Sequence, residues 1–315
     1  MILPTLAHRK YVFVLLAGVV IVMLLVGNYA YDNGISRTSF STEDALSTES
    51  AAPKQEPFPH KIWQSWKDDS EDPTDRTVGF PHQWRKINPG WRYERITDAN
   101  NDAYVRDRFD ANISDVFTSS QDPVLKADFL RYLILLREGG VWADIDTYAH
   151  QPVSKWIPKK DQGLVNLVVG IENDHHKQPI WPGSPYSVQL CQYSVLAQPN
   201  HPAIKTLVEQ VTIDLKKLLA SKQPNETVSF QDVMSTTGPF AFTKVLMDYF
   251  KEVSGEEHNG DELDRLAEPR LIGDVLVLPK DSFGWLPQQN THKKGDPSIL
   301  VEHLFIGSWR DGHPG

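Results

Sequence analysis

The hydrophobic positions of this chain follow two different periods, and their alternation predicts an α/β fold. Short apolar runs predict strands at 60–64, 91–96 and 164–171. Longer stretches with apolar residues at helical spacing predict helices at 123–138, 201–220 and 239–250. Strands that alternate with helices favour a sandwich around a largely parallel sheet. Because ligands of such sheets bind where the strands end, the loops after the strands are the first candidates for a site.

One long apolar stretch lies apart from this alternation, near the start of the chain. Residues 11–31 contain no charged side chain, and at about 1.5 Å per helical residue they can cross a hydrocarbon core of roughly 30 Å. The basic residues 8–10 keep the tail 1–10 cytoplasmic and place the rest of the chain in the lumen. A cleaved signal peptide is the alternative, but Asn and Tyr at 28–29 stand where cleavage sites carry small residues. We therefore expect an uncleaved, single-pass type II signal anchor.

The remainder of the chain divides into a stem and one compositional block. Residues 32–57 are rich in Ser and Thr and poor in large apolar side chains, which predicts an unfolded stem. Residues 58–315 contain no obvious linker, so we expect a single lumenal domain. Two glycosylation sequons, at Asn112 and Asn225, agree with a lumenal placement, and the sequence does not say whether either carries a glycan.

The composition and net charge of the chain exclude several classes of protein. Hydrophobic residues make up 40% of the chain and charged residues 23%, which excludes a disordered or a multi-span membrane protein. The net charge is −9, so nucleic acid is not expected as a partner. The single cysteine, Cys191, excludes an intrachain disulfide framework and a cysteine-based zinc site.

The predicted helix at 123–138 leads into the segment with the most chemistry. Asp122 is a good N-cap, Pro123 suits the first helical position, and the glycines at 139–140 end the helix. Asp128 and Arg131 are three residues apart and share one face of this helix. By themselves they are equally well explained as a surface ion pair, which contributes well under about 1 kcal/mol.

A short strand, Val141 to Asp144, is predicted directly after the helix. It places Asp144 and Asp146 on one side of an extended chain, where two carboxylates suit a hard divalent cation such as Mn²⁺ or Mg²⁺. An Asp-x-Asp pair alone is weak evidence. A haloacid-dehalogenase-type hydrolase is an alternative, but its motif has one residue between the second Asp and the Thr, whereas Thr147 follows Asp146 directly.

The combination of these features resembles a known family. The pattern D-x-x-R-Y-x-x-L-x-x-x-G-G-x-W-x-D-x-D at 128–146 resembles the signature of glycosyltransferase family 32, which carries a DXD sugar-binding motif. The segment 59–66 (PHKIWQSW) resembles the first strand of that family. Further matches resemble its fungal branch that begins the outer chain of N-glycans with an α-1,6-mannose; they lie at 169–172, 189–202, 237–239, 274–284 and 303–309.

The resemblance covers about residues 58–310 and implies a GT-A, Rossmann-like nucleotide-sugar transferase domain. It implies that Asp144, Asp146 and His303 bind the metal, and that Asp128 and Arg131 hold the donor sugar and a phosphate oxygen. It further implies that Ile62 and Trp63 pack near the base, and that Ser308 and Trp309 close over the diphosphate. It supplies no nucleophile. Glu172 and Asp232 are weaker candidates for holding the acceptor, and His175-His176 is expected to be a solvated loop rather than a metal pair.

The implied activity is a metal-dependent, retaining α-1,6-mannosyltransferase of the Golgi membrane, with GDP-mannose as donor and an N-linked glycan of glycoproteins as acceptor. Mn²⁺, or Mg²⁺, is the implied cofactor. Whether the chain works within a Golgi mannosyltransferase complex stays open. Two alternatives also stay open: a transferase of the same family with another acceptor or sugar, such as a sphingolipid mannosyltransferase, and a non-catalytic lumenal sugar-binding protein.

Overall fold

The computed structural model describes residues 56–70, 79–174, 184, 186–223, 226–284, 295–306 and 312–313. They belong to the second of the two units into which the chain divides, Gln55–Gly315. The predicted cytoplasmic tail, the span at 11–31 and nearly all of the stem lie outside the described residues. Within the described ranges, no helix is both long enough and apolar enough to cross a membrane.

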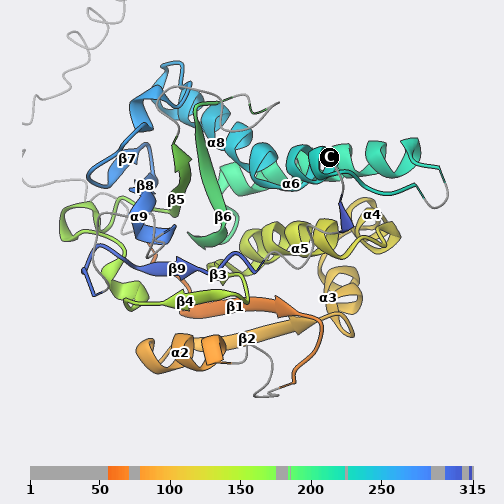
Figure 1. Ribbon diagram of the computed structural model, residues 1–315, viewed down its shortest axis with the longest axis horizontal. Helices are drawn as coiled ribbons and strands as arrows, with labels where there is room; N and C mark the ends of the chain where they lie inside the picture. The colour runs from red at the N-terminus through yellow and green to blue at the C-terminus, as the bar shows by residue number, and fades with distance from the viewer. Residues whose placement is uncertain are drawn as a thin grey trace, which may run out of the picture. The chain divides into compact units, whose positions relative to one another are not determined.

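A seven-stranded mixed sheet forms the centre of this unit (Figure 1). Its strands, in spatial order, are β2 (Arg92–Thr97), β1 (Lys61–Trp66), β3 (Gly140–Ala143), β6 (Val188–Ala197), β5 (Leu167–Asp174), β8 (Val275–Leu278) and β7 (Arg270–Ile272). Strands β2, β1 and β3 are parallel, and so are β5 and β8, whereas β6 is antiparallel to both of its neighbours and β7 is antiparallel to β8.

Five of the seven strands therefore point in the same direction, as expected for a largely parallel sheet, whereas β6 and β7 run in the opposite direction. Every residue of β6 is buried, so its sequence carries no inward and outward alternation. The sequence of a strand that is buried on both faces does not indicate its direction. The direction of β6 follows from its antiparallel pairing with β3 and β5. The strand predicted at 164–171 begins at Leu167, because Leu164 is exposed in the preceding turn.

Two hydrophobic cores lie on the two faces of the sheet. One is covered by helices, namely α3 (Asn101–Arg108), α4 (Ala111–Ser119), α5 (Pro123–Glu138), α6 (Pro202–Ser221), α7 (Phe230–Thr236) and α8 (Pro239–Ser254). The other is covered by α2 (Gly79–Ile87), α9 (Lys280–Phe283) and a two-stranded sheet of β4 (Thr147–Ala149) and β9 (Val301–His303). Strand β1 is buried on both sides, because Ile62 joins the second core and Trp63 the first.

Helix α5 has the bounds that its sequence predicts. The side chain of Asp122 accepts hydrogen bonds from the amides of Val124 and Leu125, and Pro123 occupies the first turn. Gly139 and Gly140 follow at φ +61° and +83°, a region that favours glycine. A Cβ on Gly140 would lie 2.6 Å from the carbonyl oxygen of Lys61. Only glycine therefore lets the chain pass from α5 into β3 beside β1.

Candidate functional site

The two aspartates of the DXD motif lie in a turn rather than on a strand. Strand β3 ends at Ala143, and the amide and hydroxyl of Thr147 both donate to the carbonyl oxygen of Asp144, at 3.0 and 2.6 Å. The prediction that Asp144 and Asp146 project from one extended segment is wrong in its local geometry. The turn nevertheless brings both carboxylates to the carboxyl end of β3, where the next strand, β4, begins.

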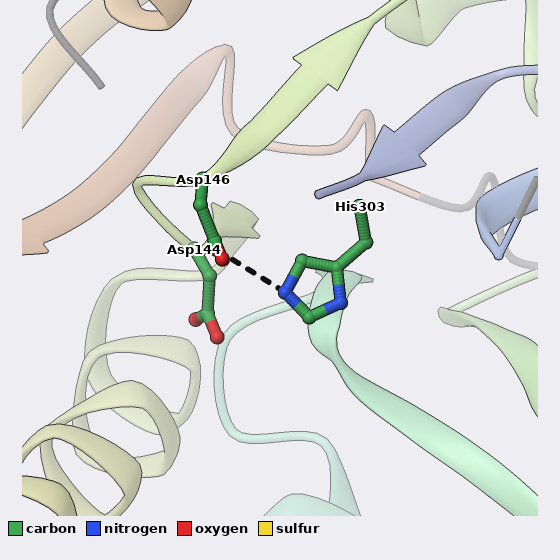
Figure 2. Close-up of side chains that lie close together, drawn as sticks. All are labelled: Asp144, Asp146 and His303. Atoms are coloured by element: carbon green, nitrogen blue, oxygen red, sulfur yellow. Dashed lines mark hydrogen bonds and ion pairs between the residues drawn. The ribbon is translucent and has the colours of Figure 1, made fainter. Parts of the chain in front are cut away.

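His303 reaches this turn through a strand pairing. Strands β4 and β9 are antiparallel and pair Thr147 with His303, so the imidazole lies beside the turn (Figure 2). Its Nε2 lies 3.1 Å from Oδ1 of Asp146. Ligand atoms of Asp144, Asp146 and His303 all lie within 4.8 Å of one another. The structure thus brings the three predicted metal ligands together, from parts of the chain 157 residues apart.

Helix α5 contributes Asp128 and Arg131 to the same place, and these two residues form with Asp144 a chain of ion pairs that we call the relay. Arg131 donates from Nη1 to Oδ1 of Asp128 at 2.7 Å and from Nη2 to both oxygens of Asp144 at 2.9 and 3.2 Å. Asp128 is 4% exposed and Arg131 is 3% exposed, so they do not form a surface ion pair. The guanidinium bridges a carboxylate in the protein interior and a carboxylate of the DXD turn.

Burial and charge act in opposite directions on this relay. Burial raises the pKa of Asp128 above its ordinary value, although the Arg131 guanidinium and the Thr237 hydroxyl oppose the rise. Burial would lower the pKa of Arg131, but the carboxylates of Asp144 and Asp128 raise it above its ordinary value. Arg131 is therefore a permanent positive charge held at one edge of the acidic turn.

Four further polar side chains hold the relay, and the sequence analysis assigned no role to them. Gln192 of β6 donates to Oδ1 of Asp128 at 3.1 Å, and the Thr237 hydroxyl donates to its Oδ2 at 3.1 Å. Trp142 donates from Nε1 to Oδ1 of Asp144 at 2.7 Å, and Gln64 of β1 donates to the carbonyl oxygen of Asp144 at 3.0 Å. All four lie within segments that carry the family resemblance, which was the available signal, but their contacts depend on the folded sheet.

The Asp146 side of the site has fewer partners. Burial raises the pKa of Asp146, but the hydrogen bond and charge of His303 and the amide of Ile306 lower it, so the pKa lies below its ordinary value. The His303 ring lies over Tyr193 and beside Phe305, with both ring centroids 4.0 Å away. The Nδ1 atom of His303 is buried without a partner among the described residues.

The donor atoms present fit a divalent cation. A carboxylate offers about four lone-pair directions. Arg131 and Trp142 use those of Asp144 only in part, and Asp146 receives one hydrogen bond on each oxygen. The Arg131 guanidinium is shared between the carboxyl groups of Asp128 and Asp144, and the carboxyl group of Asp146 is paired with the His303 imidazole. Two carboxylates with an imidazole are a donor set that suits a divalent metal ion.

The other predicted residues take different positions. Ile62 and Trp63 are buried in opposite cores, and the residue of β1 that contacts the DXD turn is Gln64. Glu172 accepts a hydrogen bond from Gln189 at 2.8 Å. The carboxylate of Asp232 closes the capping box of α7 with Ser229 and pairs with Lys222 at 2.8 Å. Asn112 is exposed on α4. Ser308, Trp309, His175, His176 and Asn225 lie outside the described residues.

Comparison with known proteins gives consistent matches. The family model "Glycosyltransferase sugar-binding region containing DXD motif" matches residues 74–162. The chain is 36% identical over 263 residues to the initiation-specific alpha-1,6-mannosyltransferase of Schizosaccharomyces pombe, a match that covers 81% of this chain and 64% of that protein. It is 30% identical over 292 residues to the protein of the same name from Candida albicans, covering 82% of this chain and 74% of that protein.

The chain therefore spans just under two thirds of the first of these relatives. Among solved structures, the PaToxG glycosyltransferase matches with 16% identity and a TM-score of 0.39, over 64% of this chain and 73% of that one. A structural likeness of this size supports no conclusion about function.

Proposed function

This chain belongs to the family of glycosyltransferases whose sugar-binding region contains a DXD motif, and we propose that it transfers mannose from GDP-mannose to an N-linked glycan in an α-1,6 linkage, initiating the outer chain. The names of its relatives in S. pombe and C. albicans support the sugar and the linkage. The donor's mannose is α-linked, so an α-1,6 product requires retention of configuration. We assign no nucleophile.

One observation carries this proposal: the convergence of Asp144, Asp146 and His303 beside the buried Arg131 guanidinium. A sugar nucleotide brings a diphosphate that gains negative charge as the glycosidic bond breaks. Fixed positive charge near the leaving oxygens stabilises that change because the protein dipoles need no rearrangement. A site for a cation and a permanent cationic side chain lie at the same turn, which is what such a leaving group requires.

Within this proposal each side chain has a definite task. Asp144, Asp146 and His303 would hold Mn²⁺, or Mg²⁺, which supplies Lewis-acid stabilisation of the diphosphate when bound. Arg131, which Asp128 and Asp144 hold in place, would supply positive charge to the diphosphate. Asp128 orients that guanidinium and keeps one lone-pair direction for a donor-sugar hydroxyl, because Arg131, Gln192 and Thr237 use the others.

The proposal extends to the fold family and the cellular context. The parallel strands β2, β1 and β3, with the site at the carboxyl end of β3, support a GT-A arrangement. The uncharged stretch 11–31 after a basic tail supports a type II signal anchor in the Golgi membrane with residues 58–315 in the lumen. Ser308 and Trp309 are proposed to close over the diphosphate. Assembly with other Golgi mannosyltransferases is a further expectation for this setting.

Transfer by the full chain tests the proposal. The protein is incubated with Mn²⁺, GDP-mannose and a high-mannose N-glycan, and the product is analysed by mass and by digestion with an α-1,6-specific mannosidase. One added hexose that this enzyme removes is the expected result. A hexose that resists digestion would overturn the linkage.

Two further outcomes decide between the remaining functions. Slow hydrolysis of GDP-mannose without transfer to the N-glycan would keep the donor and exclude this acceptor, and an inositol phosphoceramide acceptor would be tried next. Absence of both turnover and Mn²⁺-dependent GDP binding would overturn the enzyme proposal in favour of a non-catalytic lumenal protein.

A further inference from the structure

The chain leaves strand β9 through a backbone conformation that side chains rarely adopt. Phe305 has a φ of +47°, in the left-handed region. Among the described residues, the other positions without glycine in this region are Asn200 and Arg265. Asparagine tolerates the conformation and Arg265 is exposed in a turn, whereas a bulky aromatic residue there is an outlier. Such outliers cost free energy, and they persist where the surrounding structure holds them, often at a functional site.

The left-handed turn at Phe305 brings two backbone amides to Asp146. The amide of Leu304 donates to the carbonyl oxygen of Asp146 at 3.0 Å, next to the last pair of the β4–β9 ladder. The chain then bends at Phe305, and the amide of Ile306 donates to Oδ2 of the Asp146 carboxylate at 3.0 Å. Oδ2 is thus held by the backbone, and Oδ1 faces Nε2 of His303 (Figure 2).

The ring of Phe305 packs against the imidazole of the same site. Its centroid lies 4.0 Å from that of His303 and 5.9 Å from that of Tyr193. The centroids of Tyr193 and His303 are also 4.0 Å apart, so the three rings contact one another. The backbone carbonyl of Tyr193 accepts a hydrogen bond from the amide of Asp144 at 2.8 Å. The ring cluster therefore joins the imidazole to the DXD turn.

Burial of the neighbouring side chains does not account for this conformation. Leu304 and Ile306 are large aliphatic residues, yet they are 38% and 37% exposed. A segment held by hydrophobic burial would turn these side chains inward. What holds the segment instead is the ring contact of Phe305 and the two hydrogen bonds to Asp146. Both of these interactions are directed at residues of the candidate metal site.

We propose that Phe305 is a positioning residue for two of the metal ligands, an inference that rests on the metal site of the proposed function. Its left-handed backbone places the Ile306 amide on Oδ2 of Asp146, and its ring holds the imidazole of His303. Oδ1 of Asp146 and Nε2 of His303 then face each other across 3.1 Å. Because these two atoms are already oriented, binding a divalent cation requires less ordering of side chains.

Two substitutions separate the backbone of Phe305 from its ring. Phe305→Gly removes the ring and keeps the left-handed turn, since glycine adopts a positive φ readily. Phe305→Val also lacks the ring, but it disfavours the turn because a β-branched residue is strained there. Binding of Mn²⁺ to the nucleotide-free full chain is measured from the electron paramagnetic resonance signal of the unbound ion. Thermal melting of the same preparations is measured without metal.

Both variants should bind Mn²⁺ more weakly than the wild type. Phe305→Gly should weaken binding roughly 2- to 10-fold, the size of a lost aromatic pair. Phe305→Val should weaken it roughly 5- to 30-fold further, because the left-handed turn must form against a preference of this size. The melting temperature of metal-free Phe305→Gly should stay close to that of the wild type, since the lost ring contacts and the relieved backbone strain act in opposite directions.

Arg265→Gly is the matched control for the backbone change. It replaces another residue with a positive φ, +53°, in an exposed turn outside the Asp144, Asp146 and His303 cluster. The amide of residue 265, which donates to Asp174 at 3.1 Å, is kept in this variant. Arg265→Gly should therefore bind Mn²⁺ with wild-type affinity.

The outcomes separate this inference from the function on which it rests. Wild-type Mn²⁺ affinity in Phe305→Gly would overturn the role of the ring, and equal affinities in Phe305→Gly and Phe305→Val would overturn the role of the backbone. Either result leaves mannosyl transfer by the wild type untouched. A wild type that binds Mn²⁺ but transfers no mannose would overturn the proposed function alone. A wild type that does not bind Mn²⁺ would overturn the metal site and the positioning role together.

Discussion

The two halves of the candidate site are built in different ways. In the Asp128–Arg131–Asp144 half, Asp128 and Arg131 are buried on the long capped helix α5, and Asp128 receives hydrogen bonds from Gln192 and Thr237. Asp144 lies in the turn after β3 with its side chain 27% exposed, and it receives a hydrogen bond from Trp142. The Asp146–His303 half lies on a turn and a strand of three residues, β9, with side chains 14% and 12% exposed.

The first half supplies an oriented positive charge, and the second half supplies atoms that are free to bind a ligand. Asp128 and Asp144 receive hydrogen bonds from Gln192, Thr237 and Trp142 in addition to Arg131, which orients the guanidinium before charge develops. Asp146 and His303 keep open lone pairs and one mutual contact, which suits groups that exchange partners when a ligand arrives. Substitutions in the first half should therefore lower both stability and activity, and substitutions in the second half should lower activity with little change in stability.

The largest effect is expected from Arg131→Ala. This change leaves the carboxylate of Asp128 buried without its counter-charge, which should lower the free energy of unfolding by about 3–5 kcal/mol. Urea denaturation measures the change. Adding Asp128→Asn to the same protein should restore part of the loss, because it removes the uncompensated charge. A loss below about 1 kcal/mol for Arg131→Ala would show that the two halves do not differ in this way.

Asp146→Ala should lower activity far more than stability. It removes a predicted metal ligand, so Mn²⁺-dependent transfer should fall at least about 100-fold. The free energy of unfolding should fall by only about 1 kcal/mol, since the change leaves one imidazole nitrogen and the Ile306 amide without an acceptor. Turnover and thermal melting are measured on the same preparation. Retained activity would remove Asp146 from the metal site.

Thr237→Val sharpens the comparison within the buried half. The substitution keeps the shape of the side chain but removes the hydroxyl that donates to Asp128, which should lower the free energy of unfolding by about 1.5–3 kcal/mol. Thr237→Ser should recover most of the loss. Thr212→Val is the matched control, because that equally buried hydroxyl donates only to a carbonyl of its own helix. Equal losses in the two valine variants would contradict a special role for Thr237.

The smallest effect concerns acid sensitivity, and it tests a carboxylate outside the site. Burial raises the pKa of Asp274, but the imidazole of His201, 3.4 Å away, and hydrogen bonds from Asn166 and Tyr249 outweigh it and hold the pKa well below its ordinary value of 3.8. Asp274 therefore stabilises the fold above about pH 4 and loses this contribution as the pH falls below that value. Asp274→Asn should flatten the fall in stability between about pH 4 and 2. If the free energy of unfolding of Asp274→Asn falls as steeply with pH as that of the wild type, other carboxylates are responsible for the acid sensitivity.

Local features of the sequence were predicted well. Helix α5 has its predicted bounds because its N-cap, its first-turn proline and its glycine pair all act within a few residues. The helices predicted at 201–220 and 239–250 occur as α6 and α8, each with a proline in its first turn, and α8 continues to Ser254, four residues beyond its predicted end. The direction of β6 was not predictable, because a strand buried on both faces has the same apolar pattern in either direction.

The sequence predicted which residues belong to the candidate site, but it did not predict which of them contact one another. The motif pointed to Asp144, Asp146, Asp128 and Arg131, and the family resemblance added His303. Nothing local indicates that Arg131 bridges two carboxylates, since the same i, i+3 pair on an exposed helix face would be a solvated ion pair. Gln192 and Thr237 were missed for a related reason: their partner Asp128 lies 64 and 109 residues away.

By itself, the sequence determined which residues carry charge, where helix α5 begins and ends, and which chemistry two neighbouring aspartates can support, because these properties depend on composition and short-range geometry. Only the tertiary structure decided that Asp128 and Arg131 are buried, that the DXD aspartates sit in a turn, and that His303 lies beside them. These properties depend on strand pairing and on helix packing across the sheet, and both are set by contacts between segments far apart in the chain.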